Sequence, residues 1–154
     1  MRFLFPATMV VLVPALATSA VPAQQSPPAA VVIVAPFTVD RDSAGVLRAL
    51  ADTCLAHLVQ GLKAQRIEVE RRPQLSETNL DVARPAHWAV LGHLTRDAGQ
   101  FQAELRLLDV TSGEELRSYF NADKNPAAIT KFGELAAVRI ARVIEQQKGS
   151  HPGP

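Results

Sequence analysis

A single cysteine, Cys54, occurs among the 154 residues of this sequence. A domain folded from this chain therefore contains no internal disulfide, and burial of apolar groups must hold it together. Cys54 lies on the apolar side of a predicted helix, where a free cysteine behaves as a small hydrophobic residue. We expect it to be a buried core residue rather than part of an intermolecular disulfide or a reactive thiol.

The sequence also lacks an excess of charge of either sign. It contains 16 Lys and Arg residues against 15 Asp and Glu residues. Phosphate binding needs a concentrated basic face, so this balance argues against a nucleic-acid partner. The adjacent Arg71 and Arg72 are interpreted as solvated charges at the end of a strand.

Sequence motifs for catalysis and for metal binding are absent. There is no Gly-x-Ser-x-Gly elbow, no Gly-x-x-x-x-Gly-Lys phosphate loop and no Gly-x-Gly-x-x-Gly turn. The four histidines, His57, His87, His93 and His151, form no close helical pair and flank no cysteine, so the sequence offers no zinc template. His87 and His93 are expected about 20 Å apart on one strand. We predict that the protein is not an enzyme, needs no cofactor, and has no catalytic, cofactor-binding or metal-binding residue.

Other polar and aromatic side chains have simple structural interpretations. Glu68 and Glu70 share one face of an alternating strand; a glycosidase could use such a carboxylate pair, but a solvated charged face is the favoured interpretation. Trp88 lies in a predicted strand, where an aromatic residue usually packs in the core rather than stacking on a ligand. His57 is expected on a helix surface.

The N-terminal segment is typical of a secretory signal peptide. A basic start at residues 1–2 precedes an apolar run over 3–17 and small residues up to Ala23. The alternative is an uncleaved membrane anchor, but spanning a bilayer takes roughly 20 mostly apolar residues, and this run is shorter and contains two prolines. No cysteine follows the run for lipid attachment. We predict a signal peptide over 1–23 and a periplasmic or secreted protein without stable membrane insertion.

One domain is predicted over residues 31–146, between a disordered lead-in at 24–30 and a flexible tail at 147–154. The continuous, largely β-branched apolar run Ala30–Phe37 predicts a strand covered on both faces. A helix over 43–63 follows, and then an edge-like strand over 66–71, in which charged and branched residues alternate. Apolar positions expected along this helix are Val46, Leu47, Leu50, Ala51, Cys54, Leu55, Leu58, Val59 and Leu62.

The second half of the sequence predicts a short helical segment, a meander of three strands and a final helix. A short helical segment within 76–84 is stopped by Pro85, and strands are expected at 88–94, 101–107 and 116–120. In the strand at 101–107 the apolar residues alternate with Gln102, Glu104 and Arg106, as in a strand with one solvated face. A helix then begins at Asn125-Pro126, because proline suits the first turn. Its expected buried side consists of Ile129, Phe132, Leu135, Ala136, Ile140, Val143 and Ile144. The element order β-α-β-α-β-β-β-α predicts an α/β (α+β) fold: a mixed sheet of about five strands with two long helices and one short helix, and with the helices on one face.

Four segments carry a resemblance to a known group of domains. They are the strand Val32–Phe37 ending in Pro-Phe, Leu50-Ala51 in the long helix, Ala89–Leu94 passing through Gly92, and Leu107–Glu114 with its Asp-x-x-x-Gly-Glu turn. In this order they resemble the small α/β domain shared by the N-terminal part of TolB and by FlgO-type, CsgG-type and LpoB-type proteins. The resemblance extends from about residue 31 to 145. The propeller repeats of TolB, the membrane hairpins of the curli channel and a lipid-attachment cysteine are missing.

Physical reasons account for the two glycines in these segments. Gly92 allows close approach to a packed strand, and Gly113 can take the positive φ that a tight turn needs.

The resemblance implies an exported accessory protein that binds envelope proteins during assembly or transport. It does not name the partner, and it leaves a homo-oligomer open. The alternative is a small periplasmic enzyme or ligand carrier whose pocket forms only in three dimensions. The charged strand at 66–71 is a candidate partner-binding edge; the competing interpretation is that its charges only protect the edge from aggregation.

Overall fold

The computed structural model describes residues 30–40 and 44–148. The predicted signal peptide, most of the lead-in and most of the tail lie outside these ranges. The described elements, in chain order, are β1 (Val31–Val34), β2 (Thr38–Val39), α1 (Ala44–Ala64), β3 (Glu68–Arg71), the 3-10 helix η2 (Leu80–Ala83), β4 (Trp88–Asp97), β5 (Gln100–Asp109), β6 (Glu115–Asp123) and α2 (Pro126–Gln147). This α+β composition confirms the predicted fold class. None of the helices in the described ranges is long and apolar enough to cross a membrane.

The strands form one mixed sheet in the order β3-β1-β4-β5-β6. β1 pairs in parallel with both β3 and β4, and β4, β5 and β6 form an antiparallel meander. β2 continues the path of β1 and pairs in parallel with the far part of β4. The sequence did not predict β2, because a two-residue strand leaves no periodicity to detect. The edge position predicted for β3 is confirmed.

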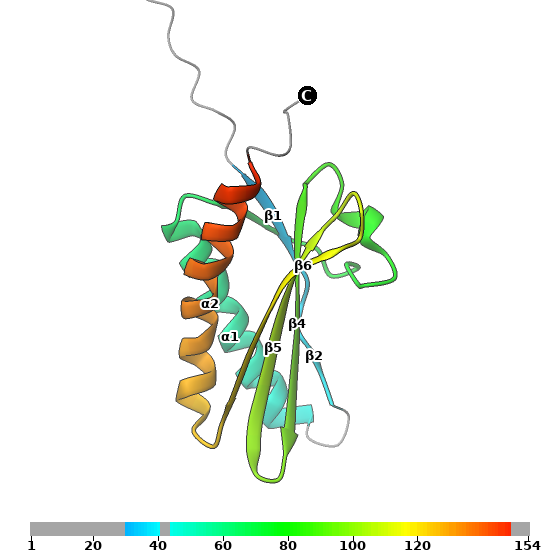
Figure 1. Cartoon of the computed structure of the whole chain (residues 1–154). Helices are drawn as coiled ribbons and strands as arrows, with labels where there is room; N and C mark the ends of the chain where they lie inside the picture. Colours follow the sequence, from blue (N-terminus) through cyan, green and yellow to red (C-terminus); the bar gives the residue numbers. More distant parts are fainter. Residues whose placement is uncertain (1–29, 41–43, 149–154) are drawn as a thin grey trace, which may run out of the picture.

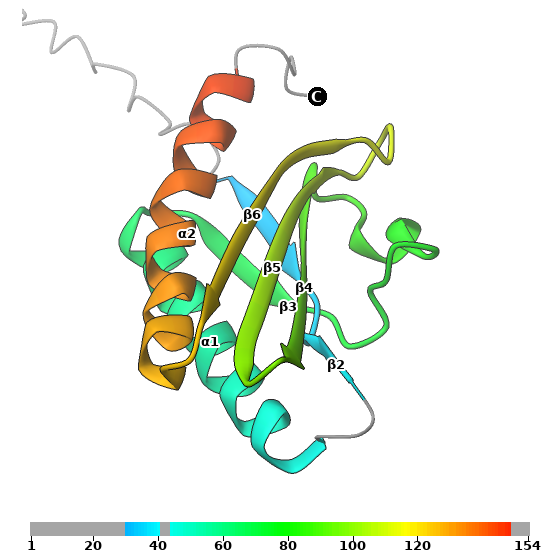
Figure 2. The ribbon, with the colours of Figure 1, turned by 60° about the horizontal axis from the view of Figure 1, so that its bottom comes forward.

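Both helices pack on the same face of the sheet, side by side (Figures 1 and 2). Two glycines allow this close packing. A Cβ on Gly133 would lie 2.4 Å from the Cys54 carbonyl oxygen, and one on Gly61 would lie 2.6 Å from the Cβ of Ala137. Asn125 caps α2 by accepting a hydrogen bond from the Ala127 N–H at 3.0 Å. The predicted start of α2 at Asn125-Pro126 is thus confirmed.

Apolar residues gather in two clusters, one on each face of the sheet. The larger lies between the sheet and the helices and includes Val32, Val34 and Cys54. The smaller includes Ile33 and lies beneath the segment that connects β3 to β4. These assignments confirm that β1 is covered on both faces, that Cys54 is fully buried and that Trp88 is a core residue.

Gly92 and Gly113 behave as predicted. The ring of Phe37 occupies the space where a Cβ on Gly92 would lie, at 2.3 Å from two ring carbons. The Pro-Phe that ends the first predicted strand therefore packs directly against the glycine of β4. Gly113 adopts a φ of 75° in the turn between β5 and β6.

Two predicted core positions are wrong. Leu135 is 54% exposed and Val46 is 64% exposed. Each precedes a buried residue, Ala136 or Leu47, and one step along an α-helix turns the side chain by about 100°. Both residues were predicted to belong to the apolar stripes of their helices because they are apolar. In α2, small residues occupy much of the buried side instead, at Gly133, Ala137 and Ala141.

Candidate functional site

Part of the sheet face opposite the helices is not covered by the β3–β4 connection (Figure 1). Opposed residues on antiparallel strands share a face, so the pairing register identifies three cross-strand rows here. We call this area the open face; it consists of Leu91, His93 and Thr95 of β4, Gln102, Glu104 and Arg106 of β5, and Ser118, Phe120 and Ala122 of β6. Its large apolar residues are Leu91, which is half-buried, and Phe120, which is 64% exposed.

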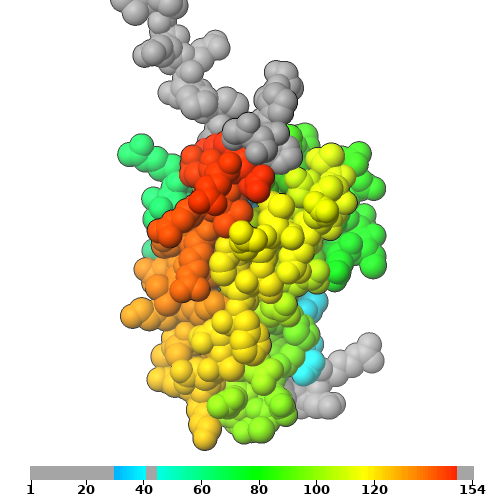
Figure 3. Space-filling model, viewed as in Figure 1, coloured from blue at the N-terminus to red at the C-terminus, as the bar shows by residue number. Residues whose placement is uncertain are grey.

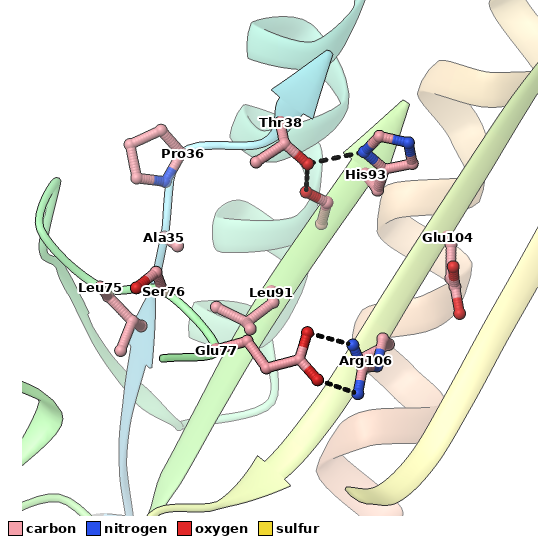
Figure 4. A pocket seen from close by; sticks show the side chains of 11 residues that line it. Ala35, Pro36, Thr38, Leu75, Ser76, Glu77, Leu91, His93, Glu104 and Arg106 are labelled. Atoms are coloured by element: carbon pink, nitrogen blue, oxygen red, sulfur yellow. Dashed lines mark hydrogen bonds and ion pairs between the residues drawn. The ribbon is translucent and has the colours of Figure 1, made fainter. Parts of the chain in front are cut away.

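A cavity of about 280 Å³ opens on this face beside the β3–β4 connection (Figure 4). Its polar lining comes from four separate segments, which are brought together only by folding. The lining residues are Ala35, Pro36, Thr38, Leu75, Ser76, Glu77, Leu91, Gly92, His93, Glu104 and Arg106. The space is therefore partly apolar and partly charged.

Arg106 is held in place by two carboxylates. Its guanidinium donates to both carboxylate oxygens of Glu77, at 2.9 and 3.0 Å, and to Glu115 at 2.5 Å. The hydrogen bond from Arg106 lowers the pKa of Glu77, and the two carboxylates together raise the pKa of Arg106. This network joins the β3–β4 connection to the sheet, so Arg106 is a positioning residue for one wall of the cavity.

Thr38 and His93 form a second polar contact in the cavity. The Thr38 Oγ1 lies 2.6 Å from the His93 Nδ1 and 3.3 Å from the Gly92 carbonyl oxygen (Figure 4). Glu104 lies opposite His93 on β5 and accepts a hydrogen bond from the Ser118 hydroxyl at 3.0 Å. The Thr38–His93 contact could not be predicted from the sequence, because the two residues are 55 positions apart. Only the alternation in β5, which predicts one polar face, pointed to Glu104 and Arg106.

The other residues weighed from the sequence lie apart from this cavity. His87 precedes β4 and packs edge to face against Trp88, with ring centroids 5.6 Å apart. His57 lies on α1 in a shallow surface hollow with residues of α2, and His151 is outside the described ranges. In the described part of the chain, no three His, Cys, Asp or Glu side chains are grouped so that they could hold a metal ion.

The two edges of the sheet differ in character. β3 has four residues, and both of its glutamates, Glu68 and Glu70, are exposed. Glu70 pairs with Arg72 at 2.9 Å, which lowers the pKa of the carboxylate. Arg72 also donates to the carbonyl oxygens of Val82 and Arg84. The interpretation of Arg72 as a solvated charge is therefore wrong: it ties the end of β3 to the η2 segment.

β6 forms the opposite edge and is nine residues long. Among the described strands it pairs with β5 alone. Figure 3 shows β6 at the surface between α2 and β5. One side of this strand therefore presents backbone N–H and C=O groups that no described strand pairs.

Comparison with known proteins shows a shared fold. No family model matches this sequence, and no curated protein matches it. A structure described as a PelC dodecamer from Paraburkholderia phytofirmans has a TM-score of 0.54 at 14% identity, over 73% of this chain and 87% of that chain. A DUF330 protein from Xanthomonas campestris has a TM-score of 0.54 at 10% identity, over 77% and 87% of the two chains.

TolB from Acinetobacter baumannii also shares the fold. Its TM-score is 0.50 at 18% identity, over 82% of this chain and 30% of the TolB chain. The sequence resemblance to the TolB group is thereby confirmed at the level of the fold.

Proposed function

We propose that this chain is an exported, non-enzymatic accessory protein that binds another cell-envelope protein along the β6 edge. The observation that carries the proposal is the nine-residue edge strand, whose outer side no described strand pairs. Unpaired backbone groups of an edge strand can accept a strand from a partner, and neighbouring side chains then provide specificity. Phe120, exposed in the middle of β6, is suited to such a contact.

The β6 edge is a better candidate than the β3 edge. β3 is short, its glutamates are exposed, and its end is tied to η2 through Arg72. Short and charged edge strands are how proteins commonly prevent pairing with other chains. These features support a protective role for the charges of β3, and they leave β6 as the edge open to a partner.

The envelope setting is supported by two observations. Residues 1–23 have the pattern of a signal peptide, and the chain shares its fold with TolB, a member of the group that it resembles in sequence. The mature protein should therefore lack about the first twenty residues. Intact-mass measurement on an envelope extract tests this, and a membrane-bound species that retains Met1 would contradict it.

A pair of proline variants tests the binding edge. Backbone N–H groups of an edge strand point alternately toward its neighbour and away from it. Arg117 and Ser118 are consecutive in β6, so the N–H group of one of them points outward. Proline at that position removes an outward donor and leaves the hydrogen bonds between β5 and β6 intact. The melting temperature identifies this variant, because it alone should unfold like the wild type. We expect it to lose capture of the envelope partner, which is detected by mass spectrometry of the proteins bound to the purified protein. Val69→Pro in β3 is the matched control and should retain capture.

The cavity on the open face is the observation that supports the alternative function, a small enzyme or ligand carrier. A threonine hydroxyl beside an imidazole is a nucleophile–base combination, and Thr38 and His93 provide it. Both side chains are exposed, whereas reactive groups are usually shielded from water, so we favour the binding role. Substrate turnover by the wild type that is lost in both Thr38→Val and His93→Gln would replace the non-enzymatic proposal.

Self-association is a second proposed property. The PelC structure that shares this fold is described as a dodecamer, which supports the proposal that copies of this chain bind one another. Sedimentation velocity over a concentration series tests it, because a self-associating protein shows a sedimentation coefficient that rises with concentration.

A further inference from the structure

The outer side of α2 carries an apolar and basic stripe, here called the α2 stripe: Lys131, Leu135, Val138 and Arg142. The spacing of four, three and four residues places these side chains along one line of the helix. All four are exposed, Leu135 at 54% and Val138 at 42%. Because α2 packs on the sheet face opposite the open face, the two surfaces lie on opposite sides of the molecule (Figure 1).

Exposed apolar side chains concentrate on these two surfaces. Four large apolar residues of the described chain are exposed: Val46, Phe120, Leu135 and Val138. Phe120 belongs to the open face, and Leu135 and Val138 belong to the α2 stripe. Apolar side chains surrounded by polar ones are the pattern expected where one protein surface contacts another.

The charges of the two surfaces are complementary. At the border of the open face, two carboxylates, Glu77 and Glu115, pair with its Arg106 and leave one negative charge in excess. Glu104 adds a carboxylate that accepts a hydrogen bond from Ser118 and forms no ion pair with any described residue. On the α2 stripe, Lys131 and Arg142 are cations that form no ion pair within the described chain. The exposed charged residues from 131 to 148 are four cations and two carboxylates: Lys131, Arg139, Arg142, Lys148, Glu134 and Glu145.

We propose that the α2 stripe of one copy of this chain docks on the open face of the next copy. This inference rests on the proposed self-association and names the surfaces that produce it. A helix laid on the open face would cover the sheet on its second side, which is the arrangement that α/β sheets commonly reach within one chain. Two different surfaces meet in such a contact, so repetition produces a closed ring or an open filament.

Charge reversal tests this contact. Glu104→Lys places a cation on the open face against the cationic stripe, and Arg142→Glu places an anion on the stripe against the acidic face. Each variant alone should self-associate at least about tenfold more weakly than the wild type, because like charges across an interface are strongly disfavoured. The double variant should recover association. A mixture of the two single variants should associate as well. In alternating copies, the cationic stripe of the Glu104→Lys variant meets the unchanged acidic face of the Arg142→Glu variant, and the acidic stripe of the Arg142→Glu variant meets the cationic face of the Glu104→Lys variant.

An apolar pair of variants provides an independent control. Leu135→Gln should weaken association, whereas Val46→Gln, on α1 and outside both surfaces, should not. Both residues are largely exposed, so neither change should lower the melting temperature. The charge variants are likewise checked by thermal unfolding.

The possible outcomes separate the two proposals. A wild type that stays monomeric over the concentration series overturns self-association and this docking arrangement together. A wild type that associates, with charge variants that associate equally well or are not rescued by mixing, overturns the docking arrangement alone. Weakened single variants, recovery in the double variant and recovery in the mixture support it.

Discussion

At the scale of single residues, Cys54 shows how burial changes a functional group. Its side chain is fully buried between the helices and the sheet, and this desolvation raises the pKa of the thiol to about 11. The thiolate is the reactive form of cysteine. A buried thiol with a raised pKa is therefore a structural group, which agrees with the sequence prediction.

The first prediction concerns Cys54 and pH. The thiol of the unfolded chain ionises near pH 9, and the folded one near pH 11. Between these values the unfolded chain has lost a proton that the folded protein retains, so the free energy of unfolding falls as the pH rises. Cys54→Ala should cost about 1 kcal/mol at neutral pH. From pH 9 to 11 this cost should shrink and then change sign, because two pKa units correspond to about 2.7 kcal/mol. Urea unfolding of both proteins measures it; a pH-independent difference would contradict the burial.

The second prediction concerns the helix contact at Gly133. A methyl group there would lie 2.4 Å from the Cys54 carbonyl oxygen, so Gly133→Ala should force the helices apart and cost about 1–3 kcal/mol. Gly45→Ala is the matched control, because no atom lies within 4 Å of its added Cβ. It should be neutral or stabilising by up to about 1 kcal/mol, since alanine favours helix. Thermal unfolding measures both; equal effects would contradict the close packing.

Residue-level prediction succeeded where local pattern determined the environment. Cys54 shares a helical stripe with leucines, and that spacing alone predicted its burial. Glu104 and Arg106 were assigned to a polar face by alternation. The ion pairs of Arg106 and the contact between Thr38 and His93 could not be predicted, because they depend on which segments folding brings together.

At the scale of elements, the turn between β5 and β6 is held by one carboxylate. Asp109 is 7% exposed, and its Oδ1 accepts hydrogen bonds from the N–H groups of Thr111 and Ser112 at 2.8 and 2.9 Å. The backbone closes the same turn, since the Gly113 N–H donates to the Asp109 carbonyl oxygen at 2.9 Å. These bonds explain the aspartate and the glycine of the Asp-x-x-x-Gly-Glu segment in physical terms.

The third prediction concerns this turn. Asp109→Ala leaves two backbone donors without their acceptor and should cost about 1–3 kcal/mol in unfolding free energy. Asp109→Asn keeps one side-chain carbonyl oxygen and should cost less. The difference is measured by chemical denaturation of the two variants. A larger loss in the asparagine variant than in the alanine variant would contradict this account of the turn.

Element positions were predictable, but the spatial order of the strands was only partly so. Helix α1 was expected over 43–63 and is found over Ala44–Ala64. The strand at 66–71 was expected at an edge because it alternates charged residues. β6 gave no such signal, since its edge position follows from the meander in three dimensions. The outward position of Leu135 was not predicted either, because small residues of α2, and not its larger apolar ones, make the contact with α1.

At the scale of the whole molecule, the two-layer architecture leaves surfaces on which contacts with other chains can form. Helices cover one face of the sheet, and the other is covered only in part (Figure 2). The β6 edge lies between the open face and α2. A partner strand at β6 and a second copy on the open face would use adjoining surfaces, so binding at one should influence binding at the other.

The most direct test of partner binding at β6 exploits the single, buried cysteine. In a Cys54→Ala background, a benzophenone label is attached to one new cysteine at a time: Ser118→Cys in β6, Glu68→Cys in β3, or Gln60→Cys on the exposed side of α1. Each labelled protein is illuminated in envelope extract, and the adducts are identified by mass spectrometry. We predict an adduct with one envelope protein from position 118, in several-fold excess over positions 60 and 68. Equal yields at all three positions, or an adduct from position 68 alone, would contradict the proposal.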